Sequence, residues 1–434
     1  MSEFSCWGRY PHAQQTAYKL SWRDQVYTVI SSENSVLPYG QGRSYGDVCL
    51  NDGGALLVSG SIDRIIEFDR HQGIIRAEAG LTLEELLRVV VPAGWFLPVT
   101  PGTRFVSLGG AVANDVHGKN HHRHGTFGSH IKRFALLRSD KNVYECSPEK
   151  EIDLFRATIA GLGLTGFILW VELQLIPIED SCIRMESIKF NSLSEFFEIS
   201  DSSNQDYQYT VAWIDCLKQG AGFGRGIFMR GNHASAAEGK GLKVYEKTLP
   251  AVPFDMPEWM LNRYTVGAFN ALYFRKQLRD SVTKIVPYDT FFYPLDAVAR
   301  WNRIYGRSGF MQFQSVCSRD VIERILQITA ASGQASFLAV IKEFGDIKSP
   351  GMLSFPRPGI TLCMDFPNRG ASTLKLLREL EELVCSRGGA LYPAKDAVMS
   401  ERSFKDCYPS WQEFMEYKDP KFSSSFWRRV TGER

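Results

Sequence analysis

Five of the eight histidines in this chain gather in one short stretch. They are His117, His121, His122, His124 and His130, in and just after the segment NDVHGKNHHRHGTFG over 114–128. Imidazole side chains bind zinc and transfer protons near neutral pH, so a metal site and a catalytic cluster are both to be weighed. The intervening glycines argue against a helix that would place His117 and His121 on one face, and no cysteine or well-spaced glutamate completes a tetrahedral set. We therefore predict no metal site.

His117 is the histidine to consider for chemistry, because it lies between Val116 and Gly118 among glycines and small residues. The alternative is a buried structural histidine whose hydrogen bonds are satisfied by the protein. We interpret His121 and His122 as hydrogen-bonded residues of a loop, not as catalysts.

Two glycine-rich segments could hold a pyrophosphate. In PYGQGRSYGD, over 38–47, three glycines free the backbone to present consecutive N–H groups to an anion, and Arg43 and Ser44 add donors. The second segment is TPGTR over 100–104 with SLGGAVA over 107–113. A lone Gly-x-Gly is more often an ordinary turn, but two such loops about 60 residues apart suggest a dinucleotide lying across both. Neither loop is a Rossmann or a Walker motif.

Further polar residues are candidates for proton transfer and substrate contact. Lys395, in LYPAKDAV, is by default a solvated lysine, but its apolar neighbours favour partial burial. A buried amine could stabilise negative charge or, with a lowered pKa, accept a hydroxyl proton. Gln312, Gln314 and Lys342 alternate with apolar residues in strand-like stretches. Their side chains would then share one sheet face, either as the floor of a pocket or as a half-exposed surface.

The elements that must position these residues are strands and helices in mixed order. Short apolar runs over 55–60, 64–69, 73–80 and 161–178 predict strands, and 81–94 predicts a helix that opens on a Thr82/Glu85 capping box. Beyond Ile178 the chain becomes richer in aromatic residues, with a predicted loop over 231–262. Strands and a helix return over 309–366, and 371–389 predicts an amphipathic helix. The fold class is therefore α+β.

Composition excludes some classes of protein. Hydrophobic residues make up 44% and charged residues 23%, so a sizeable core can form, and the net charge of +2 argues against a nucleic-acid partner. The nine cysteines are scattered and never spaced as Cys-x-x-Cys, which favours free thiols in a reducing compartment. Neither a signal peptide nor an apolar run of about 18 residues is visible, so we expect a cytoplasmic protein.

The glycine segments resemble a known family. PYGQGRSYGD, the block PGTRFVSLGGAVANDVHGKNHHRHGTFGSHI and GLGLTGFI are similar to the FAD-binding domain of the vanillyl-alcohol-oxidase/p-cresol-methylhydroxylase superfamily. Within it, the resemblance is closest to the flavoprotein subunits of decaprenylphosphoryl-β-D-ribose 2′-epimerases. It continues through GFMQFQSV, SFLAVIKEFG, LSFPRPGITLCMDFP, GGALYPAKD and DPKFSSSFWRR, and it is weakest over about 180–300. It implies an FAD-binding domain over 1–177 and 390–434, and a substrate domain with an antiparallel sheet over 178–389.

The resemblance also implies site residues. The implied FAD contacts are Pro38, Tyr39, Gly40, Gln41, Gly42, Arg43, Ser44, Tyr45, Gly46, Asp47, Gly102, Thr103, Ser107, Gly109, Gly110, Asn114, Asp115, His117, Gly118, Asn120 and Tyr392. The implied substrate contacts are Gln312, Gln314, Lys342, Phe344, Cys363 and Lys395, and the implied catalytic residues are Lys395, His117 and Tyr45. From the residues alone, Tyr45 is equally a core tyrosine, and Cys363 is first a small buried strand residue. Many superfamily members tether the flavin through a histidine at the position of Arg43, so we predict a non-covalent FAD.

The implied activity is oxidation of a secondary alcohol on a sugar-like substrate, with hydride passing to flavin N5. By the same resemblance the substrate is a polyprenyl-phospho-sugar, a separate NAD(P)H-dependent short-chain reductase completes the inversion, and the lipid substrate brings the protein to a membrane surface. The alternatives are an oxygen-using sugar-lactone or alditol oxidase, an NAD(P)H-dependent reductase of the same fold, and a flavin-binding protein without activity.

Overall fold

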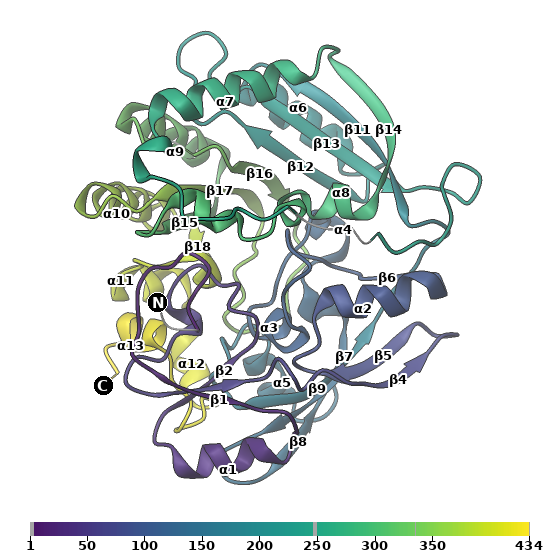
Figure 1. The fold of residues 1–434 in the computed structure, drawn as a ribbon, viewed down its shortest axis with the longest axis vertical. Coiled ribbons are helices and arrows are strands. Elements are labelled where there is room, and N and C mark those ends of the chain that lie inside the picture. The colour runs from purple at the N-terminus through teal and green to yellow at the C-terminus, as the bar shows by residue number, and fades with distance from the viewer. Residues whose placement is uncertain (1–3, 246–249, 335, 434) are drawn as a thin grey trace.

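A computed structural model describes residues 4–245, 250–334 and 336–433. Two antiparallel sheets with helices packed on them occupy opposite ends of the molecule (Figure 1). The predicted α+β, two-domain architecture is confirmed, and both glycine segments lie in the half that contains the smaller of these sheets.

The first half contains a five-stranded antiparallel sheet in the order β4-β5-β9-β7-β8 and a three-stranded parallel sheet in the order β1-β3-β2. Its strands are β1 (Thr16–Lys19), β2 (Val36–Tyr39), β3 (Ala55–Val58), β4 (Ile65–Asp69), β5 (Ile74–Glu78), β6 (Trp95–Phe96), β7 (Ile131–Leu137), β8 (Val143–Cys146), β9 (Phe167–Gln174) and β10 (Ile176–Pro177). Its α-helices are α1 (Gln25–Ser32), α2 (Leu83–Val90), α3 (Leu108–Ala113), α4 (His121–His124) and α5 (Ile152–Thr158). The capping box predicted for α2 is present, because the Thr82 and Glu85 side chains each accept from the other's backbone N–H.

The second half is an eight-stranded antiparallel sheet in the order β14-β11-β13-β12-β16-β17-β15-β18. Its strands are β11 (Cys182–Phe190), β12 (Tyr209–Ile214), β13 (Gly226–His233), β14 (Ser281–Pro287), β15 (Phe310–Cys317), β16 (Ala339–Phe344), β17 (Gly359–Pro367) and β18 (Ala390–Leu391). The remaining helices are α6 (Leu193–Ser203), α7 (Arg263–Lys276), α8 (Tyr288–Phe292), α9 (Arg319–Ser332), α10 (Ala371–Ser386), α11 (Glu401–Cys407), α12 (Trp411–Met415) and α13 (Ser425–Thr431). One face of the sheet buries apolar side chains against α6, α9 and α10, which leaves the other face free to carry polar residues.

The C-terminal segment returns to the first half. Lys421 accepts a hydrogen bond from Val36 N at 2.8 Å, and Arg429 on α13 forms an ion pair with Asp47 at 2.7 Å. β18 still pairs with β15, so the segment leaves the large sheet directly after Leu391. These pairings support domain bounds of 1–177 with 390–434 and of 178–389, which we keep as a proposal.

Two element predictions need correction. The loop predicted over 231–262 begins later, because β13 extends to His233 in antiparallel register with β11, and residues 246–249 of that stretch lie outside the described part. The predicted end of this loop agrees with the structure, because α7 begins at Arg263 after a short 3-10 turn over Glu258–Met260. A further helix, α3, forms inside the second glycine segment, because Ser107 caps it by accepting from Gly110 N.

Candidate active site

The polar face of the large sheet forms the floor of the site. Gln312 lies directly across from Asp365, and Gln314 lies across from Cys363, in the β15/β17 register. On the other side of β17, Lys342 lies across from Thr361. Because side chains alternate along a strand, all six point to one face, as the spacing of Gln312, Gln314 and Lys342 predicted. Phe344 follows Lys342 by two residues and shares this face.

His117 meets this floor from the glycine-rich half. Its Nε2 lies 2.9 Å from Gln314 Nε2, which also donates to Thr361 Oγ1 at 3.2 Å. Since the glutamine nitrogen is a donor, His117 Nε2 is the acceptor, and the proton of the neutral ring is on Nδ1. That Nδ1 is buried without a hydrogen-bond partner among the described residues. His117 is therefore positioned to donate to a ligand.

Lys395 enters the same space from the C-terminal segment. Its Nζ lies 3.8 Å above the centre of the Tyr45 ring, and no hydrogen-bond acceptor of the described chain contacts it. The Tyr45 backbone N–H donates to Ala394 O at 2.9 Å, which ties the first glycine segment to the turn before Lys395. Tyr45 itself packs edge-on against Phe310, with ring centroids 5.4 Å apart. Tyr45 is therefore a core aromatic whose ring also contacts the Lys395 amine, and its contact with the flavin stays a prediction.

Asp365 is a buried carboxyl that the sequence reasoning missed. It is 0% exposed, accepts a hydrogen bond from Gln312 Nε2, and lies 3.5 Å from the Tyr305 hydroxyl. The signal was available, because Asp365 follows Cys363 by two residues in ITLCMDF and therefore had to share its sheet face.

The electrostatics of the site are those of buried groups with few partners. Burial lowers the pKa of the Lys395 ammonium, and burial also lowers the pKa of Lys342 and of Lys119 to about 7 each. Burial raises the pKa of Asp365 to about 7, and it holds the pKa of His117 well below its usual value. Of these amines, only Lys395 acts on the Asp365 carboxyl, because Lys342 Nζ donates to Gly118 O at 2.7 Å and Lys119 Nζ donates to Phe291 O. The charges of Lys342 and Lys395 disfavour each other, so an anionic ligand beside them would be favoured.

The two glycine segments converge beside these groups. A Cβ placed on Gly40 would lie 2.2 Å from Ser107 Oγ, so the loops are in contact. A Cβ placed on Gly102 would have no protein atom within 4 Å, and a Cβ placed on Gly110 would have only Ser107 Oγ within that distance. In and directly after these segments, the atoms Arg43 Nε and Asn114 Oδ1 are buried without hydrogen-bond partners among the described residues. Open space beside glycine N–H groups and unsatisfied polar atoms fits a dinucleotide.

Comparisons with known proteins give the family. The FAD-binding domain family matches residues 25–147. Over 413 residues the chain is 35% identical to decaprenylphosphoryl-beta-D-ribose oxidase of Mycolicibacterium smegmatis, which covers 91% of this chain and 89% of that protein. The chain belongs to the decaprenylphosphoryl-beta-D-ribose oxidase family. It is an FAD-dependent oxidoreductase.

Two other relatives extend the comparison. A protein of Streptomyces coelicolor described only by its position in the mprA 5' region is 32% identical over 81% of this chain and 100% of its own length. L-gulonolactone oxidase of Mus musculus is 29% identical, but over only 32% of this chain and 31% of that enzyme. The similarity that extends along the whole chain is therefore within this family.

Several residues predicted to contact FAD have polar atoms engaged by the protein. Asp47 pairs with Arg429, and Asn120 Nδ2 donates to Pro98 O at 2.7 Å. Asp115 accepts from Gly128 N at 2.9 Å and from Ser354 Oγ at 2.6 Å. These contacts brace the loops. Tyr392 does the same from the C-terminal segment, because its hydroxyl donates to Asn114 O at 2.8 Å.

The remaining histidines of this segment contact other parts of the protein. His122 Nε2 contacts Tyr207 O at 3.0 Å, and His130 Nε2 contacts His124 O at 2.8 Å, so these rings brace the loop. His121 was expected to be hydrogen bonded and is not: both ring nitrogens are buried without partners in the described chain, and the ring packs on Phe344 at 4.6 Å. Among the described residues, no three His, Cys, Asp or Glu side chains group as metal ligands.

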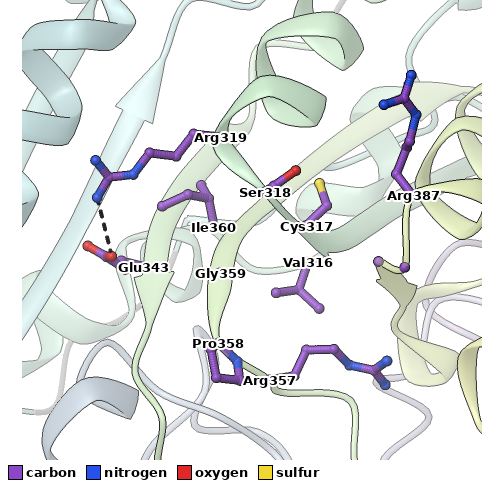
Figure 2. Close-up of a pocket in the computed structure, with 12 residues that line it drawn as sticks. Val316, Cys317, Ser318, Arg319, Glu343, Arg357, Pro358, Gly359, Ile360 and Arg387 are labelled. Carbon is purple, nitrogen blue, oxygen red and sulfur yellow. Dashed lines mark ion pairs between the residues drawn. The ribbon is translucent and has the colours of Figure 1, made fainter.

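A separate cleft lies at the end of the large sheet. It has a volume of about 500 Å³ and is lined by Val316–Arg319, Glu343, Arg357–Ile360 and Arg387–Gly389. Figure 2 shows Arg319 turned toward Glu343, with which it pairs at 3.6 Å, and Arg357 and Arg387 turned away from each other. No predicted site residue lines this cleft, so it takes no part in the chemistry described above.

Proposed function

We propose that this enzyme oxidises the 2′-hydroxyl of a polyprenylphosphoryl-β-D-ribose as the oxidase half of a two-enzyme epimerase. The observation that carries the proposal is the Lys395 amine, which lies over the Tyr45 ring near Asp365 and Cys363 and has no hydrogen-bond acceptor in the described chain. The whole-length similarity to decaprenylphosphoryl-beta-D-ribose oxidase supports the substrate class. FAD, when bound, would supply the acceptor for the hydride that leaves the carbinol carbon with its two electrons.

The chain's own groups would hold FAD in two ways. The backbone N–H groups of the segments 38–47 and 107–110, with Arg43 and Asn114, would bind its pyrophosphate and ribose. The Arg43 guanidinium stacks on the Trp7 ring at 4.2 Å, and an arginine cannot form the tether that a histidine forms, so we propose that FAD is bound non-covalently. The His117 Nδ1–H and the lysine amines would face the isoalloxazine and the sugar.

Proton transfer is assigned to Lys395. Burial lowers the pKa of the Lys395 ammonium, which favours the neutral amine that would accept the hydroxyl proton at Nζ. His117 is less suited to this role, because the lone pair of Nε2 already accepts from Gln314 and Nδ1 carries the proton. His117 would instead donate to the ligand and orient it. Gln312, Lys342, Phe344 and Cys363 would form the floor under the sugar.

The 2′-keto product has to be reduced from the opposite face for inversion. We propose that a separate NAD(P)H-dependent short-chain reductase does this. The prenyl chain of the substrate would bring the enzyme to a membrane surface; no described helix is long and apolar enough to cross a bilayer.

Anaerobic mixing of the FAD-loaded enzyme with farnesylphosphoryl-β-D-ribose tests the proposal. We expect the flavin absorbance to bleach with this substrate and not with free polyols. Bleaching by soluble polyols together with oxygen consumption would instead identify a sugar-lactone or alditol oxidase, and bleaching by NADPH alone a reductase. A purified protein without flavin absorbance that takes up no added FAD would overturn every enzymatic reading.

A further inference from the structure

Exposed apolar side chains gather in one part of the second half. Seven of the large apolar residues that the described chain leaves exposed lie within 25 positions: Phe254, Trp259, Met260, Tyr264, Phe269, Leu272 and Leu278. Trp259 is 75% exposed, Tyr264 77% and Leu278 92%, whereas the other exposed apolar residues are scattered from Trp22 to Met415. We call the segment 254–278 the apolar apron. So many large exposed apolar side chains in one short segment are unusual for a protein surface and indicate an interaction site.

The helix α7 forms the centre of the apron and is apolar on two sides. Val266 and Phe274 are buried on the side toward the sheet, where Phe274 packs with Trp213 and Ile227. Tyr264 and Leu272 occupy the opposite side of the helix, and Leu272 is 69% exposed. Figure 1 shows α7 at the end of the molecule farthest from the five-stranded sheet. Its outer side is therefore available to a partner.

The segment that precedes α7 is held in place by the protein. Ala251 bridges to Ala299, and Met256 N donates to Arg303 O at 2.9 Å. Asp255 pairs with Arg9 at 2.7 Å. Trp259 is thus presented at the surface by a braced segment, not by a loose one.

The charged residues in and beside the apron are mostly basic. Arg263 lies in the first turn of α7, Arg275 and Lys276 lie in its last turn, and Arg279 follows, all of them exposed. Of the three acids between 254 and 280, Asp255 is neutralised by Arg9, which leaves Glu258 and Asp280 against these four cations. Exposed tryptophan and tyrosine among arginine and lysine are the residue types that settle at the headgroup level of an anionic bilayer.

A row of aromatic rings joins the apron to the active site. Tyr45, under Lys395, contacts Phe310 at 5.4 Å, and Phe310 stacks on Tyr305 at 4.2 Å. Tyr305 stacks on Phe337 at 5.7 Å, and Phe337 contacts Phe269 of α7, also at 5.7 Å. These rings are packed inside the protein, so α7 is linked to the region of Lys395 by direct contacts through a buried aromatic cluster.

We propose that the apolar apron docks the enzyme on an anionic lipid bilayer, the same bilayer that would hold the prenyl chain of the substrate. The proposal rests on the proposed function for the identity of the prenyl substrate, but the docking surface itself rests on the exposed residues. Trp259 and Leu272 would insert among the lipid headgroups, and the basic residues would contact the lipid phosphates.

Vesicle flotation tests the docking. The full-length holoenzyme is mixed with vesicles of phosphatidylcholine containing phosphatidylglycerol, and with vesicles of phosphatidylcholine alone. We expect the wild type to float with the anionic vesicles, and the double variant Trp259→Ser/Leu272→Ser to bind at least about tenfold more weakly. The matched control Val143→Ser/Ile152→Ser removes two apolar side chains of the first half that are each more than half exposed, and it should float like the wild type.

Three results would overturn the docking: a wild type that stays unbound, an apron variant that floats like the wild type, or an apron variant that changes the oligomeric state in gel filtration without lipid. The last would make the apron an interface between copies of the chain.

Flavin bleaching separates this test from the proposed function. The apron variant should bleach normally with detergent-dispersed farnesylphosphoryl-ribose and slowly with a long-chain substrate embedded in vesicles. Vesicle binding without bleaching by either substrate would sink the proposed function and leave the docking standing.

Discussion

The two halves of the active site are built on different principles. In the first half, the glycine segments work through their backbone, because loops and turns approach one another so closely that side chains would not fit. In the second half, the floor works through side chains that converge from β15, β16 and β17 of one sheet. The backbone half is local in sequence, whereas the side-chain half depends on register between distant strands. Substitutions in the two halves should therefore impair the enzyme in different ways.

Gly46→Ala should have the largest effect, because it disrupts the contact between the first glycine segment and the C-terminal segment that carries Lys395. A Cβ at Gly46 would lie 1.7 Å from Asp396 O, a backbone atom next to Lys395 that cannot rotate away. We expect a loss of about 3 kcal/mol or more in the free energy of unfolding and a loss of bound FAD. Urea unfolding and flavin absorbance measure the two. The matched control is Gly267→Ala in α7, where a Cβ meets nothing within 4 Å and helix propensity favours alanine by up to about 1 kcal/mol. Equal stability of the two variants would contradict the argument.

Lys395→Met should separate chemistry from folding. The side chain keeps its length and apolar stem but loses the amine above Tyr45. We expect FAD to stay bound and flavin bleaching by farnesylphosphoryl-ribose to slow by about 10³-fold, as for loss of a proton acceptor. Stopped-flow absorbance measures the rate. Rapid bleaching by the methionine variant would remove Lys395 from its role and return His117 as the candidate base.

Asp365→Asn should change how stability depends on pH. The pKa of Asp365 is raised by burial to about 7, above its value near 4 in the unfolded chain. The stabilising protonated form is therefore fully present below about pH 4, and its contribution is lost as pH rises through 7, by up to about 1.4 kcal/mol per pH unit. The cofactor-free wild type should lose stability between about pH 5 and pH 7 in urea unfolding, and the asparagine variant should lose less. If the unfolding free energies of the wild type and the asparagine variant changed with pH in parallel, Asp365 would ionise as readily in the folded protein as in the unfolded chain.

The same contrast explains what the sequence could predict. Glycine spacing, the Thr82/Glu85 capping box and the alternation of Gln312, Gln314 and Lys342 are local signals, and each led to the observed element or face. The resemblance supplied FAD and the family, which local signals could not. Asp365 was missed because its significance comes from facing Gln312 across two strands, which a single segment does not display. α7 was missed because apolar residues on both of its sides erase the amphipathic period on which helix prediction depends.

His121 shows the limit of reasoning from residue type. A histidine in a polar loop was expected to be hydrogen bonded, but the fold buries its ring against Phe344. Burial of this kind lowers the pKa of His121 to about 4, so the ring stays neutral at physiological pH. Only the tertiary packing of β16 on the loop determines this outcome.

Cys363→Ser should have the smallest effect. It tests whether the floor of the site contributes only shape or also a reacting group. The thiol shares the sheet face of Gln314, but burial raises its pKa to about 12, so it is protonated at neutral pH and cannot act as a base or nucleophile without help. Serine keeps the size and remains a weak donor, so flavin bleaching should stay within about twofold of the wild type. As a second readout, iodoacetamide should modify Cys363 slowly below about pH 10, because the thiolate is scarce. A tenfold loss of bleaching in the serine variant, or rapid alkylation at neutral pH, would instead place the sulfur among the reacting groups, and the floor would then contribute chemistry as well as shape.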